Sequence, residues 1–314
     1  MIRYIGKRLL LMLPVVIGVI FVVYLIMYLS PGDATTTILG TSWTPEGAEA
    51  IREQLGLNEP FFKQFFTYLF HFFQGDLGTS YITKEAVINQ VRISFPNTAL
   101  LVLISMTLAV AVSIPIGIRA AVKPNSFFSA FTTAFALVGI AAPGFWIALL
   151  LVLLFSVKLG WLHASGLETW KDAILPSIVL ALSFMASISR MMRSSMIEAL
   201  GMDYVRTARA KGVKKHRVIY RHALGNALLP PLTVIGSYIG EMLGGAVICE
   251  TVFAIPGMGR LMVNAVLQKD TPSVLASVSI MAICVAIMSL ITDLAYAFFD
   301  PRIKALYMRG GKSK

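Results

Sequence analysis

Charged residues are scarce in this sequence, and their scarcity indicates the class of protein. Asp, Glu, Lys and Arg make up 14% of the chain, compared with about 25% in ordinary soluble domains. Apolar residues make up 57%, and the mean hydropathy is +0.76. These values exclude a typical soluble domain, so we predict an integral membrane protein.

Metal ligands and disulfide-forming residues are also few. The chain has two cysteines, Cys249 and Cys284, both inside apolar runs, so we expect free buried thiols. No metal site, bound cofactor or catalytic grouping is expected, because paired carboxylates are absent and no histidine has a second ligand three or four residues on: His71, His163, His216 and His222.

Nucleotide and nucleic-acid motifs are absent as well. The formal net charge is +11, but no basic patch interleaved with aromatic residues points to nucleic acid. Residues 310–313, Gly-Gly-Lys-Ser, end like a phosphate-binding loop, yet the first glycine of that motif would fall at Leu306. We expect a disordered basic tail there, so any ATP-derived energy must come from another chain.

What the sequence does contain is long uncharged runs. About 20 apolar residues, or roughly 30 Å of helix, cross a hydrocarbon core. Pro143-Gly144 indicates either a kink in the third run or an early entry of the chain along the membrane surface. The first run is too long for a signal peptide. We predict an all-α integral membrane protein with six transmembrane helices, at about 9–29, 98–119, 130–157, 173–192, 228–249 and 271–299.

Positive charges alternate between the segments that join these runs. The short outer loops hold only Lys158, Lys171, Arg260 and Lys269. By the positive-inside rule, both termini and the 198–230 loop face the cytoplasm, and the large 30–96 loop faces outward. The inner segments hold Arg3, Lys7, Arg8, Arg119, Lys123, Arg190, Arg193, the basic residues of 198–230, Arg302, Lys304, Arg309, Lys312 and Lys314.

The 30–96 loop contains an unusually aromatic stretch. Seven phenylalanines lie between Phe61 and Phe73. Such a stripe is typical of core packing or of anchoring at a membrane interface. The alternative is a surface that docks a substrate-delivering protein.

Segment 198–230 is the only long basic stretch. Asp203 is predicted to cap a helix over Tyr204–Lys211 that stops at Gly212, followed by further helical turns from Lys215 to Leu224. Ala208, Ala210 and Gly212 are small enough to let another protein approach. By itself, a basic membrane-proximal segment is also compatible with binding anionic lipid headgroups.

The same segment resembles the coupling loop of permease subunits in binding-protein-dependent ABC importers. Ala208-Arg-Ala-Lys-Gly212 and His222-Ala-Leu-x-Asn226-Ala-Leu-Leu-Pro230 are similar to the B-type subunit of the peptide/nickel class. Arg206-Thr207-Ala208 stands where the general importer pattern has Glu-Ala-Ala. The peptide/nickel class tolerates this departure. The resemblance implies contacts to an ATPase from Asp203, Tyr204, Arg206, Thr207, Ala208, Arg209, Ala210, Lys211 and Gly212, with Arg206 and Arg209 pairing with acidic groups.

The resemblance also implies an assembly in the bacterial inner membrane. A second, C-type permease would complete the pathway, two ATPase subunits would bind ATP and Mg, and an extracytoplasmic binding protein would deliver the substrate. Di- or oligopeptides are the expected substrate, and nickel or its chelate is the alternative. Ser30–Asp33, Leu55–Leu57 and Gly75–Ser80 resemble the family's first outer loop, and Thr251–Lys269 resembles its last, over the pathway mouth.

Glu241 is the one acidic residue within the 228–249 run. It lies roughly 16 Å past Pro230, near the middle of the membrane, where a carboxylate costs a few kcal/mol unless it is paired. We therefore expect a pathway role or a polar helix contact. Gly236, Gly240 and Gly244 recur every four residues and predict close helix packing. Asp293, in the last run, is expected to reach interfacial water or Arg302.

Two other kinds of protein fit the composition. An ion-coupled secondary transporter would show inverted repeats, broken helices and several midplane ionisable groups, whereas Glu241 stands almost alone. A purely structural membrane scaffold would not bind ATPase subunits through the 198–230 loop.

Overall fold

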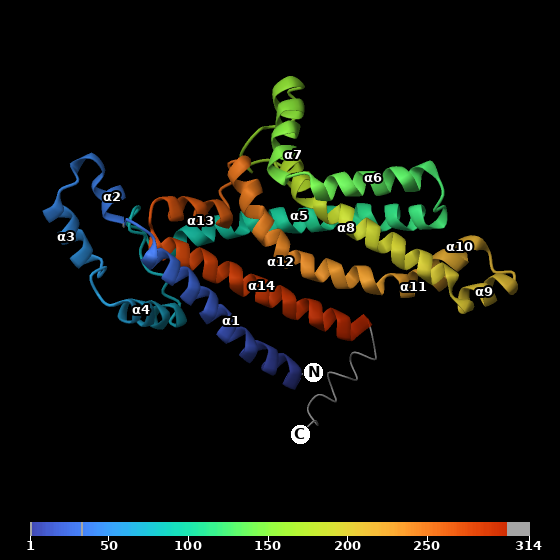
Figure 1. Cartoon of the computed structure of the whole chain (residues 1–314), viewed down its shortest axis with the longest axis horizontal. Helices are drawn as coiled ribbons and strands as arrows, with labels where there is room; N and C mark the ends of the chain where they lie inside the picture. The colour runs from blue at the N-terminus through green and yellow to red at the C-terminus, as the bar shows by residue number, and fades with distance from the viewer. Residues whose placement is uncertain (1, 33, 300–314) are drawn as a thin grey trace.

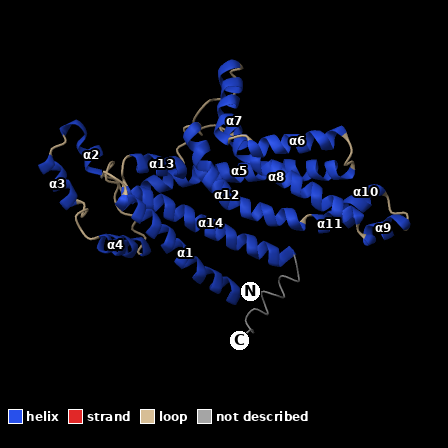
Figure 2. Ribbon diagram, viewed as in Figure 1, coloured by secondary structure: helices blue, strands red, loops and turns tan. Residues whose placement is uncertain are grey.

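The structure is a computed structural model that describes residues 2–32 and 34–299. Several residues named above lie outside the described part, as does the side chain of Arg3. These residues are Asp33, Arg302, Lys304, Arg309, the expected tail at 310–313, Lys312 and Lys314. The described part is helical without strands (Figures 1 and 2). Its α-helices are α1 Ile2–Leu29, α2 Ala34–Leu39, α3 Pro45–Gln54, α4 Phe61–Phe73, α5 Val87–Val122, α6 Phe127–Ala141, α7 Gly144–Leu151, α8 Ile174–Gly201, α9 Asp203–Ala210, α10 Lys215–Arg217, α11 Leu224–Ala227, α12 Leu229–Val252, α13 Met258–Leu267 and α14 Thr271–Phe299.

Five described helices are long and apolar enough to cross a membrane: α1, α5, α8, α12 and α14. The pair formed by α6 and the 144–158 helix makes a sixth span if it is counted as one, but it bends by 106°. Pro143 explains the bend, because proline disfavours helical backbone in the residue before it, and Ala142 has a ψ of 131°. The all-α membrane fold is confirmed, with a much sharper break than a kinked span.

Two spans are longer than the apolar runs that predicted them. α5 begins at Val87 rather than near 98, and α8 continues to Gly201 rather than ending near 192. The extra turns carry Arg92 and Arg193. Charges end an apolar run in the sequence, but they do not end the helical hydrogen bonds once the chain leaves the hydrocarbon.

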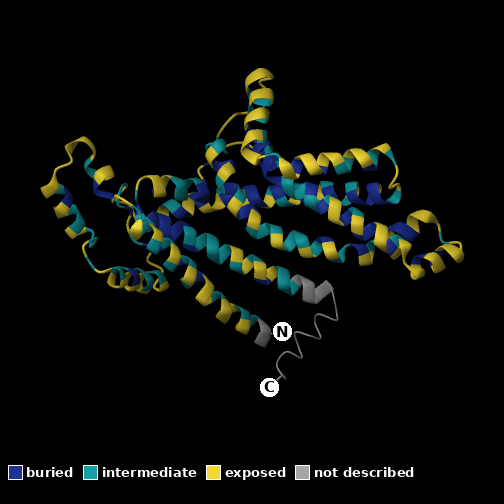
Figure 3. Ribbon diagram, viewed as in Figure 1, coloured by how far each residue is buried: buried dark blue, intermediate teal, exposed yellow. Residues whose placement is uncertain are grey.

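α5 and α8 form the centre of the molecule, where Figure 3 shows the densest burial. Small residues bring their backbones together: a Cβ built on Gly117 would lie 2.6 Å from Met192 Cβ. Ser113 Oγ also donates to the Met185 carbonyl at 3.0 Å. Such small-residue contacts are how membrane helices associate, since lipid offers no hydrophobic driving force.

α1 and α14 pack side by side at the edge of the bundle (Figure 1). Near the cytoplasmic end that we predict, Arg8 Nη2 lies 2.5 Å from Asp293 Oδ2. Arg8 is a partner of Asp293 that the sequence did not predict, and the expected partner Arg302 lies outside the described residues. The two groups are far apart in sequence, so only the packing of α1 on α14 brings them together.

Different helices lie at the two ends of the bundle (Figure 1). The start of α1, the end of α14 and α9 lie toward one end. The helices of the 30–96 loop, α2 to α4, lie with α13 toward the opposite end. This arrangement separates the basic segment 198–230 from the outer loops by the length of the bundle.

Candidate functional site

The basic segment folds as an elbow between two long helices. α8 ends at Gly201, and Met202 adopts an extended conformation with a ψ of 151°. α9 follows, and the chain then returns through α10, a π-helical stretch at Val218–Ala223 and α11 into α12. In Figure 1 α9 projects beyond the ends of its neighbouring helices, where another protein can reach it.

Gly212 stops α9 in the left-handed conformation predicted for it. Its φ is +74°, and its N–H donates to the Arg209 carbonyl at 3.0 Å. The N–H of Val213 donates to the Ala208 carbonyl at 3.2 Å. This pair of bonds is a Schellman motif, which satisfies carbonyls that the helix end leaves open.

Two expectations about single residues of α9 are wrong. Asp203 is not the N-cap, because Met202 holds that position and no side chain caps the helix. Asp203 is instead the first helical residue, fully exposed and 3.7 Å from Arg206. Ala208 was expected to contact an ATPase, but it is 7% exposed and faces its own chain.

The outward face of α9 is basic and exposed. Tyr204, Arg206 and Arg209 point away from the chain, while Thr207 Oγ1 donates back to the Asp203 carbonyl at 2.9 Å. A Cβ built on Gly212 would meet nothing within 4 Å. The exposed set comprises Asp203, Tyr204, Arg206, Thr207, Arg209, Ala210, Lys211 and Gly212.

The inward face of α9 joins it to the long helices. Val205, which is fully buried, and Ala208 lie in an apolar cluster beneath the elbow. The cluster draws on the ends of α5 and α8 and on the returning chain: Ile118, Ala121, Met192, Met196, Ala199, Val218, Ile219, Ala223 and Ala227. Close-packed interiors transmit displacement. A force on α9 therefore acts on α5, on α8 and on the segment 218–227 that precedes α12.

One face of α12 is not covered by any other described residue. Its exposed positions recur at three- and four-residue spacing and are mostly polar or small: Thr233, Ser237, Glu241, Gly244, Ile248 and Thr251. Glu241 is exposed on this face, and no hydrogen bond or ion pair joins it to another described residue. The expected buried carboxylate is therefore a polar group at the edge of the bundle.

The three α12 glycines lie in different surroundings. A Cβ on Gly236 would overlap Thr292 of α14, and one on Gly240 would lie 3.2 Å from Val285 Cγ1. A Cβ on Gly244 would meet nothing within 4 Å. Two of the glycines thus lie where α12 approaches α14 most closely, and Gly244 lies on the uncovered face.

Glu250, which sequence reasoning missed, holds together the end of the molecule opposite α9. The residue is fully buried on α12. Its carboxylate accepts from Thr98 Oγ1 of α5 at 2.5 Å and from the Arg260 N–H at 3.1 Å. Thr98 Oγ1 in turn accepts from the Met258 N–H at 2.8 Å. Together they satisfy the first N–H groups of α13, which has no capping side chain of its own.

Asp270 forms a second buried link between outer segments. Its carboxylate accepts from Ser80 Oγ at 2.5 Å, from the Tyr81 N–H at 2.8 Å and from Ser273 Oγ at 2.7 Å. Ser80 and Tyr81 belong to the 30–96 loop, whereas Ser273 lies in the first turn of α14. The large outer loop is therefore tied to the last spanning helix.

Comparison with known proteins identifies the family. Residues 113–305 match "Binding-protein-dependent transport system inner membrane component", and residues 1–102 match the N-terminal domain of the same membrane component. The chain belongs to this permease family. It is 38% identical over 315 residues to the oligopeptide transport system permease protein AppB of Bacillus subtilis, covering 97% of this chain and 100% of that protein.

Other relatives of the permease carry different substrate names. The dipeptide transport system permease protein DppB of Alkalihalophilus pseudofirmus is 39% identical, covering 97% of this chain and 100% of that one. The glutathione transport system permease protein GsiC of Salmonella typhimurium is 38% identical, covering 97% and 99%.

Solved structures support the fold of the permease. A chain of the MetNI methionine ABC transporter, in an inward-facing conformation, aligns with a TM-score of 0.58 at 14% identity. The alignment covers 68% of this chain and 97% of the methionine transporter chain. A chain of an amino acid ABC transporter aligns with a TM-score of 0.51 at 16% identity, covering 68% and 94%.

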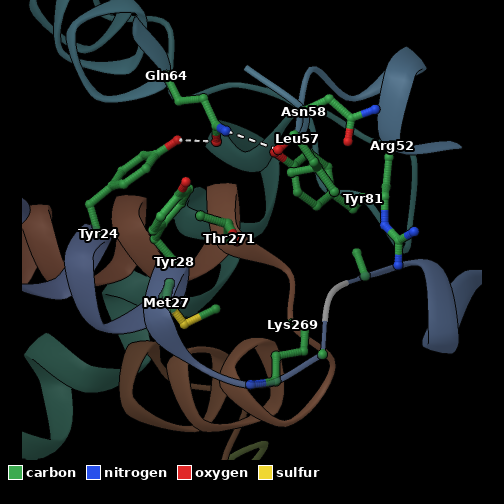
Figure 4. A pocket seen from close by; sticks show the side chains of 12 residues that line it. Tyr24, Met27, Tyr28, Arg52, Leu57, Asn58, Gln64, Tyr81, Lys269 and Thr271 are labelled. Carbon is green, nitrogen blue, oxygen red and sulfur yellow. Dashed lines mark hydrogen bonds between the residues drawn. The ribbon is translucent and has the colours of Figure 1, made fainter. Parts of the chain in front are cut away.

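The outer loop of this permease also forms a polar pocket (Figure 4). The pocket is lined by Tyr24 of α1, Gln64 of α4, Tyr81 of the loop and Lys269 of the turn before α14. The amino group of Lys269 donates to Ser30 Oγ. Tyr24 donates to Gln64 Oε1 at 3.1 Å, and Gln64 Nε2 donates to the Leu57 carbonyl at 3.1 Å. Burial raises the pKa of Tyr81 to about 12, so its hydroxyl remains a neutral donor at physiological pH.

A sequence signal for the missed residues exists but is weak. Asp270 directly precedes Thr271-Pro272, a typical helix start. Glu250 directly follows the apolar run that ends at Cys249. Both positions look like ordinary helix ends until tertiary structure supplies Thr98 and Ser80, which are distant in sequence.

Proposed function

We propose that this permease forms half of a pathway that imports di- or oligopeptides. A second, C-type permease completes the pathway, an extracytoplasmic binding protein delivers the peptide, and two ATPase subunits bind ATP and Mg and power the cycle. Near-full-length similarity to relatives named as oligopeptide and dipeptide permeases carries this proposal. Glutathione, named for a third relative, is itself a small peptide.

In this proposal the elbow couples ATP hydrolysis to transport. The exposed residues of α9, from Asp203 to Gly212 without Val205 and Ala208, seat in a groove of an ATPase subunit. Arg206 and Arg209 pair there with acidic groups. The buried cluster under Val205 supports this role, because it gives the ATPase a rigid connection to α5 and α8.

The orientation follows from charge. The end of the bundle that carries α9 also carries the start of α1 and the C-terminal parts of α5 and α8 (Figure 1). The sequence places Lys7, Arg8, Lys123 and Arg190 in or next to these segments. Positively charged ends of membrane helices face the cytoplasm. We therefore assign both termini and the 198–230 loop to the cytoplasm of the bacterial inner membrane, and α2 to α4 to the outer side.

The uncovered face of α12 is proposed to face the pathway or the second permease. A carboxylate such as Glu241 is costly in lipid, so a water-filled pathway or a polar partner is the environment that suits it. Gly236 and Gly240 serve the packing of α12 on α14, and Gly244 leaves room on the exposed side for the second permease.

Two measurements test the proposal. Uptake by the complete transporter in proteoliposomes should be inhibited by vanadate and should persist when ion gradients are dissipated; the reverse pattern would identify a secondary transporter. Mass spectrometry of ligands that co-purify with the cognate binding protein should find short peptides. A nickel ion or chelate in their place would overturn the peptide assignment while leaving the ATP-driven mechanism intact.

A further inference from the structure

α4 has an aromatic face that no other described residue covers. Phe62, Phe66, Phe70 and Phe73 are 62%, 61%, 65% and 56% exposed. At 100° per residue these four side chains lie on one side of the helix. They form a single apolar strip that carries no charge and no hydroxyl group.

The strip lies between two other faces of α4. On one side Phe61, Phe65, Tyr68 and Phe72 pack against the chain. On the other side the exposed residues are polar: Lys63, Thr67, His71 and Gln74. The helix is thus apolar over two adjoining faces and polar over the third, which is typical of a helix held at a membrane interface.

The depth of α4 is set by its contacts with α1. The rings of Phe61 and Phe65 lie 5.7 and 5.3 Å from the ring of Phe21, centroid to centroid. Phe61 also lies 5.1 Å from the ring of Tyr28. Phe21 precedes the end of α1 at Leu29 by about 12 Å of helix. α4 therefore lies beside the outer turns of a spanning helix, and not above them.

The exposed surface of α1 beside α4 is apolar too. Val22 and Ile26, which flank the turns that α4 contacts, are 53% and 60% exposed. α1 is an uncharged span over this stretch, so these side chains face lipid. The phenylalanine strip continues that lipid-facing surface at the same depth.

A docking partner fits this strip less well than lipid does. A non-obligate interface, taken as a whole, is about as polar as the rest of a protein surface. The strip carries no polar group and lies beside exposed apolar turns of a spanning helix. We propose that Phe62, Phe66, Phe70 and Phe73 insert into the acyl chains of the outer leaflet. Lys63, Thr67, His71 and Gln74 face the headgroups, so α4 anchors the base of the outer loop to the membrane surface.

Spin labels on adjacent faces of α4 test the proposal in the complete transporter. Cys249 and Cys284 are first replaced with alanine. Phe66→Cys and Phe70→Cys probe the strip, and Thr67→Cys and Gln74→Cys are matched controls on the polar face. In phosphatidylethanolamine/phosphatidylglycerol liposomes, labels at 66 and 70 should be accessible to oxygen and protected from a water-soluble nickel chelate. Labels at 67 and 74 should show the opposite pattern.

Other outcomes contradict lipid insertion. Protection of 66 and 70 from both reagents means that protein covers the strip, and protection that appears only after the binding protein is added means docking. Free access of the nickel chelate at 66 and 70 means solvent exposure. If a cysteine variant fails to assemble, the conservative Phe70→Trp variant tests the same proposal. If the strip lies in lipid, the fluorescence of the introduced tryptophan should be quenched by brominated lipid and not by acrylamide.

Discussion

At the scale of single residues, buried carboxylates hold together the end of this permease that lies opposite α9. Glu250 joins α12, α5 and α13, and Asp270 joins the outer loop to α14. Each accepts its bonds from hydroxyl and backbone N–H groups, so each is well satisfied within a buried setting. Removing one acceptor leaves the donors unpaired, which costs about 1–3 kcal/mol per group.

We expect Glu250→Ala to lower the thermal unfolding midpoint of the purified transporter and to loosen α13. The loss should be larger than that of Glu241→Ala, because Glu241 makes no bond within the described chain. Thr98→Val removes one branch of the same network, so its effect and that of Glu250→Ala should fall short of additivity in the double variant. Full additivity would contradict a shared network.

Gly236 and Gly244 form a natural pair for testing helix packing. Gly236→Val places a branched side chain against Thr292, so we expect a stability loss of about 1–3 kcal/mol from overpacking. Gly244→Val should leave the isolated chain as stable as before. If α12 faces the second permease there, the same variant should reduce co-purification of that subunit. Equal stability losses at both positions would contradict the packing described.

The pH dependence of one outer loop follows from Asp172. Its carboxylate accepts from the N–H groups of Glu168 and Thr169 and lies 2.5 Å from His163 Nδ1. These bonds, chiefly the one from Thr169, lower its pKa to about 2. A lowered carboxylate pKa stabilises the folded loop above the unfolded pKa of about 4, and that stabilisation is lost as the pH falls toward 2.

Amide hydrogen exchange of residues 159–173 can measure this effect. Protection should fall between about pH 4 and pH 2 in the parent chain. Asp172→Asn should show lower protection at neutral pH and little change on acidification. An unchanged pH profile in that variant would mean that another group controls the loop.

At the scale of elements, α9 works only if it is both exposed and anchored. Its basic face is open to a partner, while Val205 and Ala208 fix it to α5 and α8. The Schellman turn at Gly212 sets the direction in which the chain returns. Non-glycine residues disfavour the φ of +74° found there.

Gly212→Asp should therefore abolish transport without preventing membrane insertion. The substitution strains the turn and places a negative charge among the basic residues that we propose contact the ATPase. Uptake and ATPase co-purification should both be lost, while the amount of permease in the membrane stays near the parental level. Gly212→Asn is the matched control, because asparagine is close to aspartate in size and in its tolerance of the left-handed region but carries no charge. It should keep part of the activity. Normal uptake by Gly212→Asp would rule out this coupling mechanism.

At the scale of the whole molecule, the helices place basic and aromatic surfaces at opposite ends. α9 and the basic ends of α5 and α8 lie at one end, and α2 to α4 lie at the other (Figure 1). In the proposed function, this separation lets force from the ATPase enter on one side of the membrane while substrate arrives from the other. α12 connects the two ends, since it begins at the elbow and ends at Glu250 and α13.

The proposed orientation can be tested with single cysteines. In a background with Cys249 and Cys284 replaced by alanine, Glu46→Cys should react with a membrane-impermeant maleimide in spheroplasts. Lys214→Cys should react only after permeabilisation, because it lies in the elbow. The opposite labelling pattern would place the basic end outside and overturn the proposed import mechanism.

The sequence by itself determined the membrane class, most spans and the stop of α9 at Gly212. These depend on apolar run length and on the backbone freedom of one residue, both of which are local. It also indicated the family, because 198–230 keeps its motif as a continuous string. The sequence did not predict the start of α5 or the end of α8, because charged turns can remain helical outside the hydrocarbon.

Only the tertiary structure decided which side chains meet. Glu250 with Thr98, Asp270 with Ser80 and Asp293 with Arg8 are each joined across distant segments. The tertiary structure also decides that Ala208 is buried, whereas Glu241 and the phenylalanine strip of α4 are exposed. Periodicity tells which residues share a face of one helix, but burial depends on which other helix packs there, and that is a property of the whole fold.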